Sequence, residues 1–411
     1  MQLRYRDHVI DVEDAQRTIL EACPPMAAVE TALDDVVGRV LAADVTASED
    51  VPPFANSAVD GYAVRAADVA EVPAELSVVG ELAAGAAPYE GVLAAGQAVR
   101  IMTGAPMPAG ADAVAMVEDS TRLDGGRVRL GAALRTGVAV RGAGDDVRAG
   151  DVVLRAGTVV TPAVAGVLAS VNARRVLAFP SARVAVLSTG DELVTDGSPL
   201  RPGQIRESNS TMLAPLLAQA GCTVDRRPVV PDDEAELEAV LRDAATTNDA
   251  VVTSGGVSMG DYDVVRAVLG RIAEMTWMQV AIKPAKPLAF GTLAGVPIFG
   301  LPGNPVSSLV SFELFARPAL RRMMGHAHLA RPSVVGVTDV DLRRQSDGKV
   351  HFLRVNGEFG DDGRYHVRPV AAQGSHQLSA TALADALVVL PDGEGVPAGT
   401  DVAVLILNLG H

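Results

Sequence analysis

Residues 182–324 alternate between short apolar runs and longer amphipathic segments, and this alternation most constrains how the chain can fold. The apolar runs predict strands at 183–187, 223–230, 250–253, 275–282 and 296–299. The segments between them predict helices at about 207–220, 232–246, 262–272 and 305–323. Such a pattern favours a mainly parallel sheet with helices packed against it. Ligands of these sheets bind at the carboxyl ends of the strands.

A glycine-rich loop, SGGVSMGDYD (254–263), follows the third predicted strand. Its small residues are Ser254, Gly255, Gly256, Ser258 and Gly260. Glycine lets a backbone approach a ligand closely, and free N–H groups between a strand and a helix favour an anion. The carboxylates of Asp261 and Asp263 favour a divalent cation beside that anion. The loop therefore indicates a phosphorylated ligand with a metal ion, or else a tight turn closed by an aspartate helix cap.

Two further loops of similar character follow other predicted strands. In STGDEL (188–193), the residues Ser188, Thr189 and Gly190 can face phosphate oxygens, and Asp191 and Glu192 can hold a metal ion. The loop GLPGNP (300–305) opens the long helix and contains Pro302, Gly303, Asn304 and Pro305. Each loop alone is also typical of a tight strand-to-helix connection. Three of them in one domain indicate a ligand site.

The segment IKPAKP (282–287) holds two lysines, Lys283 and Lys286, each followed by a proline that stiffens the backbone. Exposed lysines often belong only to a solvated surface. The chain carries a net charge of −15, with 50 acidic and 35 basic residues. A bound anion must therefore be held locally, against the field of the whole protein. We interpret the two lysines as a phosphate or oxyanion site.

The regions outside 182–324 differ in pattern. Residues 11–43 predict two helices separated at Pro24–Pro25, and residues 162–170 predict a helix that packs with them. Between 45 and 151, runs at 76–79, 98–101, 113–117 and 127–130 predict an all-β insert. After Pro332 the chain is rich in strands, with a predicted hairpin of 351–355 and 365–368 around the turn 360–363.

The insert also carries polar residues in its turns. Asp60 lies in PPFANSAVDGYAV, Thr103 in MTGAP, and Asp145 and Asp146 in GAGDD. Each of these positions is also typical of an ordinary turn. Carboxylates that converge must be protonated or share a cation. If these acids meet the loops of 182–324, the sequence predicts a metal-assisted reaction of a phosphoanhydride or an oxyanion.

Composition excludes several other classes of protein. Aromatic residues make up only 3%, and the acidic balance opposes a nucleic-acid-binding surface. Cys23 and Cys222 form neither a disulfide framework nor a zinc signature. The N-terminus is too polar for a signal peptide, and no apolar run approaches the roughly 20 residues of a transmembrane helix. We therefore expect a cytoplasmic protein with no transmembrane segment and no nucleic-acid partner.

Eight motifs occur in a specific order: NSAVDGYAV, IMTGAPMP, GDD, STGDEL, SGGVSMGDYD, IKPAKPLAFG, GLPGNPVS and GSHQLS. From about residue 8 to the C-terminus, this ordered set resembles the molybdopterin molybdenumtransferase (MoeA) family, to which the E domain of gephyrin is similar. The resemblance implies a multidomain α/β fold with four parts. They are a segmented helical domain (1–44 plus 149–180), a β insert (45–148), a three-layer MogA-like α/β domain (181–328) and a C-terminal β domain (329–411).

The resemblance also implies an activity and its residues. The reaction transfers molybdenum from molybdate to adenylylated molybdopterin with Mg²⁺, and AMP leaves; the sequence leaves open whether tungstate replaces molybdate. The catalytic residues implied are Asp60, Thr103, Asp146, Glu192 and Asp263. The metal ligands implied are Asp191, Glu192, Asp261 and Asp263. The molybdate ligands implied are Lys283, Lys286, Arg368 and Ser375. The residues implied to bind substrate are Asp232, the two lysines and the small and proline residues of the three loops, namely Ser188, Thr189, Gly190, Ser254, Gly255, Gly256, Ser258, Gly260, Pro302, Gly303, Asn304 and Pro305.

Two kinds of partner follow from the resemblance. Members of the family form homodimers in which the β insert of one subunit reaches the α/β domain of the other, so that active sites are shared. A gephyrin-like scaffold that binds a short peptide of a membrane or cytoskeletal protein is the alternative function. All the catalytic acids are present, which favours the enzyme. One departure is Ala285, where the family usually has glycine between the two lysines.

Overall fold

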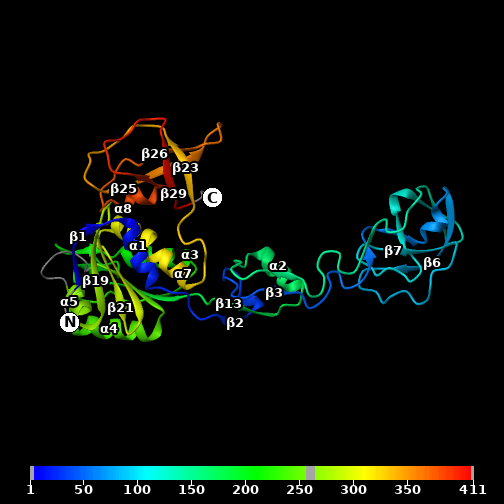
Figure 1. Cartoon of the computed structure of the whole chain (residues 1–411), viewed down its shortest axis with the longest axis horizontal. Coiled ribbons are helices and arrows are strands. Elements are labelled where there is room, and N and C mark those ends of the chain that lie inside the picture. The colour runs from blue at the N-terminus through cyan, green and yellow to red at the C-terminus, as the bar shows by residue number, and fades with distance from the viewer. Residues whose placement is uncertain (1–3, 256–263, 409–411) are drawn as a thin grey trace. The chain divides into compact units, whose positions relative to one another are not determined.

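The computed structural model describes residues 4–255 and 264–408, which form two compact units. The first, called the α/β unit, comprises Met1–Val29, Gly38–Val40 and Phe179–His411. The second, called the insert unit, comprises Glu30–Val37 and Leu41–Ala178. Figure 1 shows the elements of both units.

A seven-stranded sheet forms the centre of the α/β unit, in the order β1-β19-β21-β22-β18-β14-β17. The strands are β1 (Arg4–Ile10), β14 (Arg183–Ser188), β17 (Thr223–Arg226), β18 (Ala250–Ser254), β19 (Glu274–Val280), β21 (Pro287–Leu293) and β22 (Val296–Leu301). The predicted mainly parallel sheet is confirmed, because β17, β14, β18 and β22 are parallel neighbours. The antiparallel strand β21 and the edge strand β1 were not among the predicted strands.

Helices cover both faces of this sheet, so this part of the unit has three layers. On β14, Val184 and Val186 pack into a core with α1, α3 and the segment 305–323, whereas Ala185 and Leu187 pack into a second core with α4 and α5. This division follows from the alternation of side chains along a strand. The helices are α1 (Val12–Glu21), α3 (Asn209–Gln219), α4 (Glu234–Thr247), α5 (Val264–Ile272), α6 (Pro305–Ser311) and α7 (Arg317–Met323), with a π-helical turn at Phe312–Ala316.

The second helix predicted in residues 11–43 is wrong. After α1 the chain forms β2 (Val29–Ala32), which pairs with β13 (Arg175–Ala178), and then a 3₁₀ turn at Leu33–Asp35. The apolar residues that suggested a helix, such as Val36 and Leu41, are buried instead in a small core beneath α2 (Pro162–Ser170). Tertiary packing of an irregular segment thus produced spacing that resembles a helix.

The insert unit contains one six-stranded sheet, in the order β8-β5-β7-β6-β10-β9. Its strands are β5 (Gly61–Val64), β6 (Ala74–Leu82), β7 (Gln97–Ile101), β8 (Ala113–Met116), β9 (Ser120–Leu123) and β10 (Arg127–Leu130). The four predicted strands of the insert are therefore confirmed. Shorter pairs join β3 (Val45–Thr46) to β12 (Val152–Leu154) and β4 (Asn56–Ser57) to β11 (Val140–Arg141).

The C-terminal part of the α/β unit is a closed sheet. The order β25-β26-β23-β29-β27 is completed by pairing of β27 with β25, and β20 (Ile282–Lys283) adds to β25. The other strands here are β23 (Ser333–Thr338), β25 (Val350–Phe359), β26 (Tyr365–Pro369), β27 (Ala386–Leu390) and β29 (Asp401–Ile406); α8 is Leu378–Ala382. Smaller pairs are β15 (Leu193–Val194) with β16 (Ile205–Arg206) and β24 (Leu342–Arg343) with β28 (Gly395–Val396).

The predicted hairpin forms, but with a different register. Residues 355–359 pair with β26, whereas residues 351–355 pair with β27. The strand β25 is long enough to pair with β26 along one part and with β27 along another, and this double pairing closes the sheet. In the part of the chain that the structure describes, no helix has the length and apolar character needed to span a membrane.

Candidate functional site

Three predicted loops begin side by side, at the carboxyl ends of β14, β18 and β22. Ser188 is level with Ser254, and Ser254 with Leu301, in the parallel register of these strands. The chain leaves β14 toward β17 on one side and returns to β18 on the other, by helices on opposite faces of the sheet. The loops after β14 and β18 therefore flank a topological switch point, where α/β sheets bind ligands.

Glycines allow these loops to turn sharply. Gly190 has φ +143° and Gly255 has φ +98°, values that side chains disfavour. Their N–H groups donate to the carbonyls of Val230 (3.2 Å) and Leu301 (3.1 Å), which ties each loop to a neighbouring segment. A Cβ at Gly190 would collide with the carboxylate of Glu192. Gly190 thus leaves room for the predicted catalytic acid.

A buried carboxylate that the sequence analysis missed, Glu207, supports the loop after β14. It accepts hydrogen bonds from the hydroxyls of Ser188 (3.0 Å), Ser210 (2.8 Å) and Thr211 (3.2 Å) and from the Ser210 N–H (2.6 Å). Its side chain is only 1% exposed and lies 3.4 Å from Arg226. Burial opposes its ionisation, but the hydrogen bonds outweigh burial and lower the pKa of Glu207. Glu207 therefore holds the Ser188 loop as a charged anchor.

Asn209, also missed, joins the other two strand ends. Its Nδ2 donates to Ser254 Oγ (2.7 Å) and to the carbonyl of Gly303 (2.7 Å). Glu207 and Asn209 both come from the segment ESNS at the start of α3. A polar run at the start of a helix is typical of an N-terminal cap. Only the fold shows that this run connects three loops.

The described acids of this site come from two neighbouring turns. Asp191 Oδ1 accepts from the N–H of Asp232 (3.1 Å), and Asp232 Oδ2 lies 3.5 Å from the N–H of Asp191. Among the residues that the structure describes, no three His, Cys, Asp or Glu side chains surround a common metal position. Five predicted residues lie outside the described chain: Gly256, Ser258, Gly260, Asp261 and Asp263.

The predicted oxyanion residues come from three separate segments of the α/β unit. Lys283 and Lys286 are both exposed, and within residues 4–255 and 264–408 neither forms an ion pair with a carboxylate. Ser375 lies against the GLPGNP loop, because its carbonyl accepts from the N–H of Val306 (3.2 Å). Arg368 instead pairs with Asp339 (Nε–Oδ2, 2.8 Å), and its side chain is 71% exposed.

Arg354, which the sequence analysis did not select, holds the loop that carries Ser375. Its guanidinium is buried and donates to the carbonyls of Gly374 (3.1 Å) and Gln377 (2.9 Å) and to Thr381 Oγ1 (3.0 Å). Burial lowers the pKa of Arg354. Arg354 lies on β25 and binds the loop that carries Ser375, and this loop in turn contacts the segment after β22. Arg354 therefore connects the closed sheet to that segment.

The insert unit brings its three motifs together at one end. The N–H and Oγ1 of Thr103 both donate to Asp60 Oδ1 at 2.7 Å, and these bonds lower the pKa of the Asp60 carboxyl. β4 pairs with β11, and the N–H of Asp146 donates to Val51 (2.9 Å), so the segment with Asp146 runs beside the one that leads to Asp60. The three motifs of the insert are therefore neighbours in the structure.

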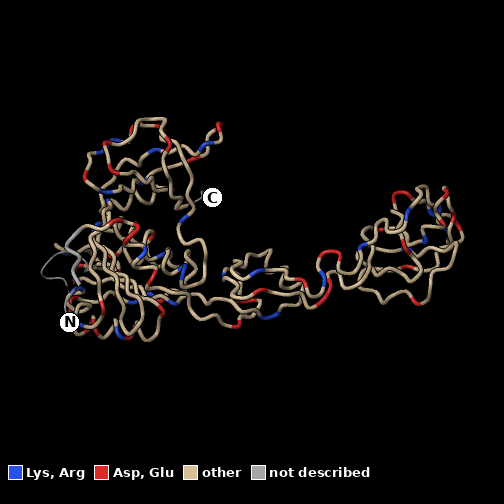
Figure 2. Tube along the Cα trace, viewed as in Figure 1, with Lys and Arg blue, Asp and Glu red and all other residues tan. Residues whose placement is uncertain are grey.

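Acidic and basic positions are interspersed along both units in the described trace (Figure 2). An anionic ligand must therefore be held by particular side chains and backbone groups, as the net charge already indicated.

Models of three protein regions match the chain in order. The MoeA N-terminal region (domain I and II) matches residues 10–172, the probable molybdopterin binding domain matches 185–322, and the MoeA C-terminal region (domain IV) matches 341–407.

Relatives match over almost their whole length. The molybdopterin molybdenumtransferase of Haemophilus influenzae is 37% identical over 402 residues, covering 97% of this chain and 99% of the relative. Molybdopterin molybdenumtransferase 2 of Mycobacterium tuberculosis is 40% identical, covering 96% and 98%. A molybdopterin biosynthesis MoeA protein from Pyrococcus horikoshii, known from its crystal structure, is 31% identical to this chain in sequence. The two structures match with a TM-score of 0.80, over 97% of this chain and 99% of that one. With its motifs, its fold and these full-length matches in agreement, the chain belongs to the MoeA family.

Proposed function

We propose that this protein is a molybdopterin molybdenumtransferase, which moves molybdenum from molybdate into adenylylated molybdopterin and releases AMP. The observation that carries the proposal is the register of β14, β18 and β22, which puts the starts of three motif loops next to one another at a switch point. Full-length relatives named for this reaction support it.

In this proposal, the glycine turns and the lysine segment bind different parts of the substrates. The glycine turns after β14 and β18 allow the phosphates and pterin to approach the backbone closely. Lys283 and Lys286 provide positive charge for molybdate, a tetrahedral dianion that needs several converging donors. Their ammonium groups remain available for this role, because neither is paired with a described carboxylate.

Mg²⁺ is part of the proposal, and the donor set suits it. Asp191 and Glu192 offer carboxylate oxygens directly after β14, the ligands that hard cations prefer. Mg²⁺ commonly uses only one or two protein carboxylates and takes its other ligands from water and substrate phosphates. When bound, the ion would neutralise charge on the phosphoanhydride; Gly190 and the hydrogen bonds between Asp191 and Asp232 hold the acids in place for it.

Asp60, Thr103 and Asp146 complete the site in this proposal, from the insert unit of a second copy of the chain. A C₂ homodimer would then contain two identical shared sites.

The test is a single-turnover assay of the purified chain with adenylylated molybdopterin, molybdate and Mg²⁺, following AMP release and molybdenum bound to the pterin. We expect both products to appear together in the wild type and to be strongly reduced in Glu192→Gln. The control is Glu234→Gln, which changes an exposed glutamate on α4 that pairs with Arg271 on α5. Equal turnover in both variants would remove Glu192 from the site, and no AMP release by the wild type would refute the proposed function.

A further inference from the structure

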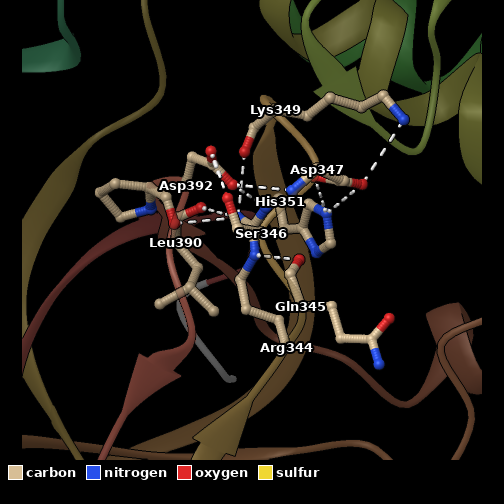
Figure 3. A network of polar contacts seen from close by, with 9 residues as sticks. Arg344, Gln345, Ser346, Asp347, Lys349, His351, Leu390 and Asp392 are labelled. Atoms are coloured by element: carbon tan, nitrogen blue, oxygen red, sulfur yellow. Dashed lines mark hydrogen bonds and ion pairs between the residues drawn. The ribbon is translucent and has the colours of Figure 1, made fainter.

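A polar network in the closed sheet surrounds His351 (Figure 3). Arg344, whose side chain is only 3% exposed, donates to Asp347 (2.7 Å) and Asp392 (2.8 Å). The Nε2 of His351 lies 3.2 Å from both carboxylate oxygens of Asp347, and Lys349 lies 3.4 Å from the same carboxylate. None of these residues belongs to the motifs of the proposed site.

The network adjoins the lysine segment through strand pairing. In the parallel register of β20 with β25, Lys283 is level with His351. Residues that are level in neighbouring strands project from the same face of a sheet. His351 is 7% exposed and Lys283 is exposed, so the imidazole lies beneath the surface next to the base of the lysine.

The charges around His351 oppose one another. Burial lowers the pKa of its imidazole most, the hydrogen bond to Asp347 raises it, and the positive charges of Arg344 and Lys283 lower it, with a net decrease from 6.5. The imidazole therefore binds a proton less readily than a free histidine side chain does. An anion beside Lys283 would offset the repulsion and favour the protonated ring.

We propose that His351 is a positioning residue of the oxyanion site: held by Asp347 and level with Lys283, it adds a proton-dependent positive charge that strengthens binding of a tetrahedral dianion to the lysines. The inference rests on the oxyanion role of Lys283 in the proposed function. Coupling between two sites is reciprocal, so the anion must raise the pKa of His351 by the same factor by which the proton raises anion affinity.

The test uses sulfate, a tetrahedral anion that stays a dianion across the range examined, and the full-length protein with isotope-labelled histidine. As the pH falls from about 8 to about 5, we expect sulfate affinity to rise roughly threefold to tenfold. Saturating sulfate should raise the pKa of His351, measured by NMR, by about half a unit to one unit. Molybdate should compete with sulfate at a fixed neutral pH.

Variants separate the contributions. His351→Gln should keep sulfate binding but lose this pH dependence. His366→Gln is the control, because His366 is a second histidine held by carboxylates (Asp339 and Asp362) on the same sheet. Asp347→Asn retains the imidazole, removes the group that favours its charge, and should move the midpoint to lower pH. It also provides a readout if His351→Gln does not fold.

Lys283→Ala distinguishes failure of this inference from failure of the proposed function. If Lys283→Ala weakens sulfate binding while His351→Gln keeps the full pH dependence, His351 has no such role. If Lys283→Ala binds sulfate like the wild type, the oxyanion site itself is wrong, and the role of His351 falls with it.

Discussion

The two units hold their predicted site residues in opposite ways. In the α/β unit, Ser188 and Ser254 are buried and their hydroxyls hydrogen-bond to Glu207 and Asn209 on one short segment. In the insert unit, Asp60 is exposed, and the hydrogen bonds described for its carboxylate come from Thr103. The first set of residues is part of the framework of a domain, whereas the second lies on the surface of one.

This difference separates stability from chemistry. Removing a partner from a buried hydrogen-bonded group leaves an unsatisfied polar atom and costs folding free energy. Replacing an exposed carboxylate in a turn changes little beyond its own charge. The comparison therefore predicts that replacing an exposed site residue of the insert unit, such as Asp60, affects activity alone. Replacing a buried residue that supports the strand ends, such as Glu207, should affect stability as well.

The largest effect is expected for Asp60→Asn. Loss of this charge should reduce AMP release by about a hundredfold or more, because charges placed at a reacting group contribute that much. The melting temperature of the variant should equal that of the wild type. The control is Asp44→Asn, which alters another exposed carboxylate that accepts a backbone N–H, from Ala156 (2.8 Å). If Asp60→Asn melts earlier and turns over normally, the comparison is reversed and Asp60 is only a turn residue.

The next largest effect is recovery of activity in mixtures. Asp60→Asn and Asp263→Asn should each be inactive alone. If the insert of one subunit completes the site of the other, half of the dimers in an equal mixture are heterodimers, and one of the two sites in each is intact. Activity should then approach roughly a quarter of the wild-type value. Mass spectrometry must show that subunits have exchanged; inactive mixtures would then mean that each site is built from one chain.

Glu207→Gln tests the buried side of the comparison. The amide cannot accept all the hydrogen bonds of the carboxylate, so we expect a loss of about 1–3 kcal/mol in the free energy of unfolding, with activity falling in parallel. Because folding lowers the pKa of Glu207, its contribution is present above the unfolded pKa and is lost as the pH falls through the folded one. The stability difference between wild type and variant should therefore shrink below about pH 4.5.

Exposed Glu234→Gln serves as the control here too and should change stability by less than about 0.5 kcal/mol. A Glu207 variant that is as stable as this control at neutral pH would show that the buried hydrogen bonds are not what fixes the loop after β14.

The sequence predicted the parts of the site that follow local rules. Apolar runs that end in glycine placed Ser188 and Ser254 at strand ends, and parallel strands then had to bring their loops to one edge. The same reasoning failed for residues 24–43, where buried positions in turns imitate helical spacing.

Contacts between distant segments could not be predicted in this way. Asn209 reaches a loop 94 residues later in the chain, and no local pattern in ESNS specifies that partner. The long strand β25 reads as one arm of a hairpin, yet half of it pairs with β27 and closes the sheet. Register and long-range hydrogen bonds are set by packing, which a local pattern does not contain.

The smallest effect is expected at Ala285, in the lysine segment. Its φ of +79° lies in the left-handed region, which explains why glycine suits this position. Ala285→Gly should relieve about 1 kcal/mol of backbone strain, offset by a similar loss of backbone entropy and of one buried methyl group. Ala289, fully buried in β21 and outside the residues with positive φ, is the matched control. Ala289→Gly gains no such relief, so chemical denaturation should show it to be less stable than Ala285→Gly by about 1 kcal/mol. Equal losses would mean that Ala285 carries no strain, and that the lysine segment is held as firmly as the interior of the sheet.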